Sequence, residues 1–211
     1  VTLVFDDGIK RLARVVNVET RQLELVEELD DNVELPVQVT IASGFPKGDK
    51  LEFITQKVTE LGASQIWAFP ADWSVAKWDG KKLGKKVEKL EKIALGAAEQ
   101  SKRNLVPSIT LFEKKFDFLA QLDQFDRIVV AYEESAKEGE AAALIQSLTG
   151  LEVGSKLLLI FGPEGGLSPA EIESFTAKGA VLAGLGPRIL RAETAPLYAL
   201  SAVSVVTELM N

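Results

Sequence analysis

Residues 161–171 read Phe-Gly-Pro-Glu-Gly-Gly-Leu-Ser-Pro-Ala-Glu and follow directly on the apolar run of residues 156–160. A continuous apolar run of this length is typical of a parallel strand that is buried on both faces. Ser168, Pro169 and Glu171 fit an N-cap, a first-turn proline and a capping box, so a helix is predicted to begin here. The glycines between strand and helix would let backbone amides approach a ligand closely, although a plain tight turn has the same outline.

A second glycine turn lies downstream, where residues 185–196 read Leu-Gly-Pro-Arg-Ile-Leu-Arg-Ala-Glu-Thr-Ala-Pro. It follows a short apolar run, residues 180–185, that we expect to be a strand, and it leads into a predicted final helix over residues 195–210. Arg191 and Glu193 could be an ordinary surface ion pair, with Thr194 as a helix cap. Two glycine turns that follow neighbouring strands favour a shared ligand crevice instead. Neither turn has the G-x-G-x-x-G or P-loop spacing of the common nucleotide sites.

Strands and helices alternate through the rest of the chain. From residue 36 onward we expect strands at 37–42, 66–69, 127–132 and 156–161, and helices at 49–61, 82–100 and 139–148. This order predicts an α/β domain with a parallel sheet. Residues 1–35 read as short strands at 1–5, 10–18 and 23–26, followed by an acidic run at 27–31 that we expect to be a solvated loop or an edge. These residues are too few to hold a core alone.

The composition narrows the chemistry, because the 211 residues include no cysteine and no histidine. Disulfides, thiolate nucleophiles, Ser-His-Asp triads and metal sites built on Cys or His are therefore excluded, and no metal is expected. What remains is chemistry by carboxylates, arginines, lysines, hydroxyls and backbone amides, with a bound cofactor for the difficult step. No apolar run approaches the roughly 20 residues of a membrane span, and no leader is evident, so we expect a cytoplasmic protein without membrane contact.

A basic stretch stands out in a chain whose net charge is −7. Residues 77–103 hold nine basic and four acidic side chains, and Trp73 and Trp78 lie beside them. A positive stripe with nearby aromatic rings suits contact with a phosphate backbone and stacking on bases. The same stretch could be a solvated helix face. Its contrast with the acidic remainder favours a polyanionic partner.

Several segments together resemble the RsmE family of the SPOUT superfamily, the 16S ribosomal RNA uracil-N3 methyltransferases. They are residues 162–172 and 185–195, supported by KGDKLE at 47–52, QKVTELG at 56–62 and AAEQSKR at 97–103. The resemblance implies a SPOUT-type parallel sheet with a C-terminal trefoil knot over residues 36–211. It also implies that residues 1–35 are part of a small, incomplete PUA-like β-barrel that binds RNA. The implied cofactor is S-adenosylmethionine, the implied substrate is 16S rRNA of the small ribosomal subunit, and the implied assembly is a homodimer with composite active sites.

Carried over by position, the resemblance implies a cofactor site on three loops, with the adenine ring buried by apolar side chains and its edge read by backbone groups. The expected cofactor-binding residues are Tyr132, Glu133, Ile160, Phe161, Gly162, Pro163, Glu164, Gly165, Gly166, Leu185, Gly186, Arg188, Ile189, Leu190, Thr194 and Ala195. The expected RNA contacts are Lys82, Lys85, Lys86, Lys89, Gln100 and Arg103. As a catalytic hypothesis, Arg191 or Arg188 stabilises the developing uracil anion and Glu193 accepts or relays the N3 proton.

The chain departs from the family pattern at two internal places. Ala192 stands where the family commonly has threonine. The segment Asp72-Trp73-Ser74-Val75 stands where the family more usually has a segment that contains Ser, Glu and Arg. Two alternatives to the N3 methyltransferase stay open at this point. One is a knotted RNA-binding assembly factor without transfer activity, and the other is methylation of another position or of tRNA.

Overall fold

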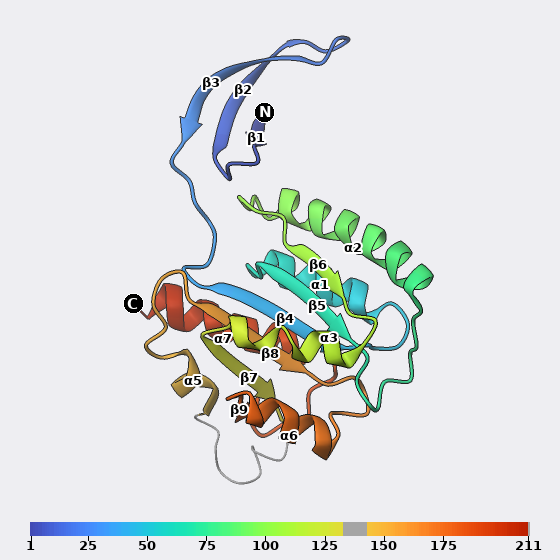
Figure 1. The fold of residues 1–211 in the computed structure, drawn as a ribbon. Helices are drawn as coiled ribbons and strands as arrows, with labels where there is room; N and C mark the ends of the chain where they lie inside the picture. The colour runs from blue at the N-terminus through green and yellow to red at the C-terminus, as the bar shows by residue number, and fades with distance from the viewer. Residues whose placement is uncertain (133–142, 211) are drawn as a thin grey trace.

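The computed structural model describes residues 1–132 and 143–210, and within them the strands form two separate sheets (Figure 1). An antiparallel N-terminal sheet has the order β1-β2-β3, and a parallel sheet has the order β6-β5-β4-β8-β7-β9. The strands are β1 (Thr2–Val4), β2 (Lys10–Asn17), β3 (Gln22–Leu29), β4 (Gln38–Gly44), β5 (Gln65–Phe69), β6 (Ser108–Leu111), β7 (Arg127–Ala131), β8 (Lys156–Phe161) and β9 (Val181–Ala183). The helices are α1 (Lys50–Glu60), α2 (Gly80–Gln100), α3 (Lys115–Leu119), η1 (Leu122–Gln124), α5 (Ala143–Leu148), α6 (Pro169–Ala177), α7 (Ala195–Ser204) and the π-helical turn η2 (Val205–Leu209).

Strand β8 lies in the middle of the parallel sheet, and helices cover both of its faces. Leu157 and Leu159 belong to the apolar cluster that β8 shares with α1, α5 and α7. Leu158 and Ile160 belong to the cluster on the other face, which includes Phe118 of α3 and Phe175 of α6. Because both faces are buried, the strand is apolar at successive positions and not only at alternate ones.

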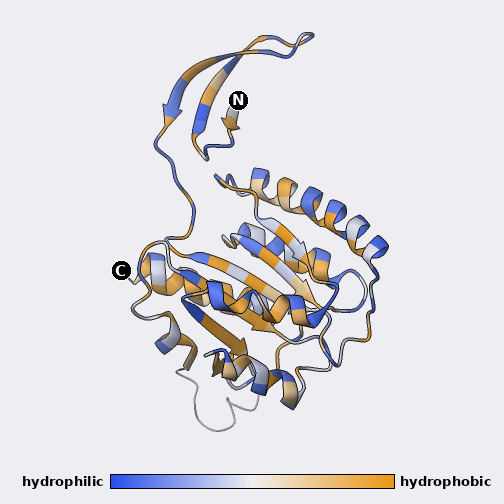
Figure 2. Cartoon of the chain, in the orientation of Figure 1, coloured by the Kyte–Doolittle hydropathy of each residue, from blue (hydrophilic) through white to orange (hydrophobic). Residues whose placement is uncertain are grey.

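Helix α2 is a second layer outside α1. Its apolar stripe includes Leu83 and Leu90, which pack with Phe45 and with Leu51 of α1. Asp79 caps the helix by accepting a hydrogen bond of 2.9 Å from the Lys82 backbone nitrogen. Figure 2 shows hydrophilic residues along the whole length of α2, interleaved with the apolar ones. Five of the six lysines of α2, at positions 81, 82, 85, 89 and 92, are exposed.

The structure bears out most of the predicted elements and revises a few. Strand β8 has the predicted ends, and α6 begins with the predicted capping box, in which Ser168 accepts from the Glu171 backbone and the Glu171 side chain accepts from the Ser168 backbone. The acidic run is split: residues 27–29 continue the edge strand β3, and residues 30–31 are outside it. Strand β6, α3 and η1 were not predicted, the last strand is shorter than expected, and the final helix changes to η2 after residue 204. Of the helix predicted over residues 139–148, the structure has α5 at 143–148, and residues 139–142 lie outside the described residues.

Two further findings concern what the described residues lack. No helix over residues 1–132 and 143–210 is both long and apolar enough to cross a membrane. In the same part of the chain, acidic side chains do not gather into a group of three or more that could hold a metal ion.

Candidate active site

A cleft of about 830 Å³ opens where the strands of the parallel sheet end. The turn after β8 and the segment after β9 both line it, and so do Ala131 and Tyr132 at the end of β7. The predicted shared crevice is therefore present, because parallel strands end at the same edge of the sheet. A smaller hollow of about 100 Å³ shares part of this lining. Its walls are Ala131, Tyr132, Leu185, Gly186, Arg188, Ile189, Leu190 and Ala195.

The turn after β8 is packed tightly, and two positions accept only glycine for this reason: Gly162 in the turn itself and Gly44 on the adjacent strand β4. A Cβ atom built on Gly44, at the end of β4, would lie 2.5 Å from Cδ of Pro163. A Cβ atom on Gly162 would lie 2.8 Å from the carbonyl carbon of Gly166, which itself has a φ of 79°. The glycines thus let the backbone curl back on itself and rest on the adjacent strand. The cleft wall is backbone here, as a cradle for a small ligand requires.

Lys50, near the start of α1, joins the two turns at the cleft. Its Nζ atom lies 2.9 Å from Oε1 of Glu164 in the first turn and 3.0 Å from Oε2 of Glu193 in the second. The Lys47 backbone nitrogen also donates to Glu164 Oε1 at 3.1 Å. Glu193 is thus paired with Lys50, and not with Arg191 as in the alternative of an ordinary surface ion pair. Sequence spacing could not reveal this bridge, because Lys50 comes from the first helix of the domain.

The bridge shifts the pKa values of the three groups toward their charged forms. Burial raises the pKa of Glu164, but the Lys50 hydrogen bond and backbone donors outweigh it and hold that pKa below its ordinary value. Burial likewise raises the pKa of Glu193, and its backbone hydrogen bond, Lys50 and the charge of Arg191 together bring it below the ordinary value. Hydrogen bonds to Glu164 and Glu193 raise the pKa of Lys50. Both carboxylates are therefore anionic at neutral pH, and Glu193 is a weak base.

Most of the predicted cofactor residues surround the cleft, with three exceptions. Ile160 is fully buried in the core on one face of the sheet, and it does not line the cleft as expected. Thr194 is exposed at the N-cap of α7 and makes no capping bond through its side chain. Glu133 lies outside the described residues. Arg191 lines the larger cleft, whereas Arg188 lines the smaller hollow.

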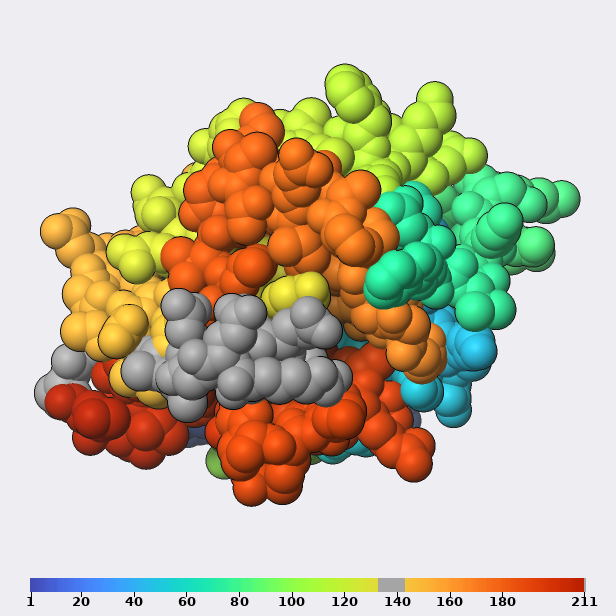
Figure 3. Space-filling view, turned by 90° about the horizontal axis from the view of Figure 1, so that it is seen from below, coloured from blue at the N-terminus to red at the C-terminus, as the bar shows by residue number. Residues whose placement is uncertain are grey.

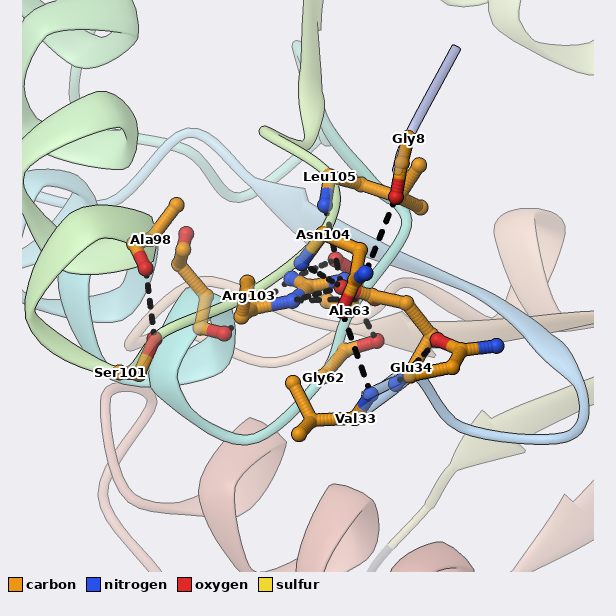
Figure 4. Close-up of polar contacts among 12 residues, drawn as sticks. Gly8, Val33, Glu34, Gly62, Ala63, Ala98, Ser101, Arg103, Asn104 and Leu105 are labelled. Carbon is orange, nitrogen blue, oxygen red and sulfur yellow. Dashed lines mark hydrogen bonds and ion pairs between the residues drawn. The ribbon is translucent and has the colours of Figure 1, made fainter. Parts of the chain in front are cut away.

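Arg103, expected to contact RNA, is instead a buried structural residue (Figure 4). Only 5% of it is exposed, and its guanidinium donates to the carbonyl oxygens of Ala63 at 2.6 Å, Thr59 at 3.2 Å and Gly62 at 3.4 Å. Arg103 also pairs with the carboxylate of Glu34, which accepts hydrogen bonds from the backbone nitrogens of Asn104 and Leu105. The RNA contact expected of Arg103 is corrected accordingly, because a guanidinium whose donors are used inside the protein cannot reach a phosphate.

The lysines of α2 remain on the surface. Lys82, Lys85 and Gln100 are exposed. Lys89 is exposed too but donates to Glu52 of α1 at 2.6 Å, and Lys86 lies over the ring of Trp78 at 4.3 Å from its centroid. The helix therefore offers positive charge to a partner, with Lys82 and Lys85 the least engaged of the four lysines.

Reasoning from the sequence missed several residues of the larger cleft, and two of them, Lys50 and Trp73, have side chains that can contribute charge or stacking. Lys50 lies within the KGDKLE segment, and Trp73 follows the end of β5; both line the larger cleft. The rule that ligands bind beyond the carboxyl ends of parallel strands could have indicated Trp73. No local signal indicated Lys50, because its role depends on two carboxylates far along the chain.

These features define a class: an α/β protein that binds a small ligand in a glycine-walled cleft at the carboxyl edge of its parallel sheet. Comparison with known proteins makes the class specific. Residues 33–204 match the RNA methyltransferase domain family. The chain is 54% identical over 207 residues to ribosomal RNA small subunit methyltransferase E of Bacillus subtilis, covering 97% of this chain and 81% of that protein.

A further relative and a solved structure point to the same family. The protein of the same name from Mycobacterium tuberculosis is 32% identical, over 97% of this chain and 78% of its own length. The crystal structure of the Neisseria gonorrhoeae ribosomal RNA small subunit methyltransferase E bound to S-adenosyl methionine has a TM-score of 0.80 and 26% identity, covering 98% of this chain and 83% of that one. The chain belongs to the ribosomal RNA small subunit methyltransferase E family. This membership supports an enzyme and not a transfer-inactive assembly factor.

Proposed function

We propose that this protein transfers a methyl group from S-adenosylmethionine to N3 of a uridine in 16S rRNA of the small ribosomal subunit. The observation that carries the proposal is the convergence of the two glycine turns on one cleft at the carboxyl edge of the sheet. The relatives named as small-subunit rRNA methyltransferases support the substrate class, and the neighbour bound to S-adenosyl methionine supports the cofactor.

The residues of the cleft fit this cofactor. Backbone of the turn after β8 can hydrogen-bond an adenosine because no Cβ blocks it at Gly162, Gly165 and Gly166. Leu185, Ile189 and Leu190 supply apolar contact in the adjoining hollow. When bound, S-adenosylmethionine supplies a methyl group that is already activated by its sulfonium. The chain's own task is then to align the acceptor and to remove its proton.

Arg191 is the residue we assign to the acceptor. It lines the larger cleft with an exposed side chain, so its guanidinium can stabilise the anion that forms as uracil N3 loses its proton. Arg188 lines the smaller hollow and is placed to contact the cofactor. Glu193 does not itself line the cleft, and it can relay the proton only as a weak base, because its backbone hydrogen bond and the Lys50 bridge lower its pKa. Arg191 therefore carries more of the catalytic effect than Glu193.

The wider architecture follows the same proposal. Residues 36–211 would form the SPOUT methyltransferase domain with a C-terminal trefoil knot, and residues 1–35 part of a PUA-like β domain that binds RNA. A homodimer is supported by exposed apolar side chains near the C-terminus, namely Tyr198, Val205, Leu209 and Met210. The exposed lysines of α2 would contact the rRNA backbone. We place this reaction in the cytoplasm.

The test is incubation of the protein and S-adenosylmethionine with 30S subunits that lack the modification, followed by mass spectrometry of the nucleosides. The expected product is 3-methyluridine; its absence, or methylation of another nucleoside, contradicts the proposal. Arg191→Ala should abolish transfer while calorimetry shows nearly unchanged affinity for S-adenosylmethionine. Equal loss of both would reject the role assigned to Arg191.

A further inference from the structure

Trp73 is exposed in a way that the other two tryptophans are not. Trp67 is 5% exposed and packs edge-on against Phe112, Phe118 and Phe125. Trp78 packs against Phe45 with the two rings tilted by 31°, and the ammonium of Lys86 lies over its ring. Trp73 is 49% exposed, lines the larger cleft, and has no aromatic or cationic partner among the described residues. One π-face of a large ring is therefore available inside the proposed active site.

The backbone around Trp73 is held firmly against the first glycine turn. A Cβ atom on Gly165 would lie 3.0 Å from Cβ of Trp73 and 3.2 Å from its carbonyl oxygen, and the edge of the ring lies beside Gly166. Figure 3 shows the corresponding contact between the teal segment around residues 70–80 and the orange segment that follows β8. The tryptophan thus sits directly on the wall that we assign to the cofactor.

A polar network fixes the residue before it. The Asp72 backbone nitrogen donates to Glu171 Oε1 at 2.9 Å, and Ser168 Oγ donates to Asp72 Oδ2 at 2.5 Å. Lys115 bridges the Asp72 and Glu171 carboxylates, and Glu171 is 1% exposed. The ring is therefore carried by a segment that is anchored to the start of α6, and little conformational freedom remains to be lost when a planar ligand stacks on it.

The substrate requires such a surface. N3 of uracil lies on the base-pairing edge, so the target must be unpaired and withdrawn from its stack before it can react. A withdrawn base loses its stacking partners, and enzymes that act on bases replace them with aromatic side chains. We propose that Trp73 is a substrate-contact residue of this chain, whose ring stacks on the target uracil beside the methyl donor. The inference rests on the proposed function and adds the residue that holds the base.

The first experiment separates stacking on the base from support of the cofactor. Trp73→Ala should lower kcat/KM for unmodified 30S subunits about 5–150-fold, the range of stacking on one base, with unchanged affinity for S-adenosylmethionine in calorimetry. Trp73→Phe should keep most of the activity, whereas Trp73→Leu, apolar but without a π-face, should resemble Trp73→Ala. Phe116→Ala is the matched control, because Phe116 is 76% exposed on α3 and does not line the cleft. Full activity of Trp73→Ala or Trp73→Leu, or a parallel loss of cofactor affinity, overturns the proposal.

The second experiment does not depend on methyl transfer. Tryptophan emission is titrated with a short single-stranded RNA that contains a central uridine, in the presence of S-adenosylhomocysteine. The wild type should show quenching that Trp73→Phe lacks, while the Phe116→Ala control keeps it. Quenching without transfer to 30S subunits would contradict the proposed function and leave the stacking role standing. Transfer without quenching that depends on Trp73 would contradict the stacking role alone.

Discussion

Replacing Arg103 by alanine should destabilise the whole domain and not merely weaken RNA binding. The guanidinium is buried, pairs with Glu34, and donates to three carbonyl oxygens that close the end of α1 and the turn after it. Removing one partner of a buried ion pair typically costs about 3–5 kcal/mol, because the remaining charge is left without compensation. In the variant, the carboxylate of Glu34 keeps two backbone donors, at 2.8 and 3.1 Å, so water needs to replace only the hydrogen bonds that Arg103 donated. We expect a loss within that range.

The assay is urea unfolding followed by circular dichroism. With a slope of about 2–3 kcal/mol/M, the Arg103→Ala midpoint should fall by about 1–2.5 M, with the slope unchanged. Arg103→Lys should recover only part of the loss, since an ammonium cannot donate along the guanidinium fork. Lys85→Ala is the matched control: it removes an exposed cation from α2 and should leave the free energy of unfolding within about 0.5 kcal/mol of wild type. Equal midpoints for Arg103→Ala and Lys85→Ala would refute the reasoning.

Three further outcomes are expected. Gly44→Ala should lower the free energy of unfolding by about 1–3 kcal/mol and weaken binding of S-adenosylmethionine in calorimetry, because its Cβ would collide with the turn after β8. Gly84→Ala, with open space around the new Cβ, should instead stabilise the protein by about 0.5–1 kcal/mol. Lys85→Ala should weaken binding to 16S rRNA fragments and reduce the slope of log affinity against log salt by about 0.7–0.9, and an unchanged slope would remove Lys85 from the interface. Lys50→Met should make the free energy of unfolding depend less on pH in the acid range. The pKa values of Glu164 and Glu193 are lowered in the folded state. Their stabilisation is therefore present above the unfolded-state pKa of about 4.5 and is lost as pH falls through the lowered values. Urea midpoints between pH 3 and 7 measure this, and parallel curves for the variant and wild type would contradict it.

Local signals were enough for the elements that carry the cleft. The run at Lys156–Phe161 became a central strand, and Ser168 with Glu171 became a capping box, because strand burial and helix capping are decided by residues within a few positions of one another. Strand β6 and helix α3 escaped prediction, since each is only a few residues long and shows too little periodicity.

Side-chain partners were not predictable in the same way. Arg103 and Gln100 look alike as polar residues at the end of a basic helix, yet one is buried on Glu34 and the other is exposed. Ile160 and Phe161 are neighbours in an apolar run, and the alternation of strand side chains sends them into the core clusters on opposite faces of the sheet. Only Phe161, the last residue of β8, also lines the cleft.

The sequence by itself determined that this protein is an α/β fold with two glycine turns after parallel strands, that its chemistry uses no Cys or His, and that its positive charge gathers on one helix. Only the tertiary structure decided that Lys50 joins Glu164 to Glu193, that Arg103 is structural, and that Trp73 opens into the cleft. The physical reason is range: turns, caps and strand burial depend on residues a few positions apart, whereas ion pairs and cleft walls join segments that meet only after the sheet has formed.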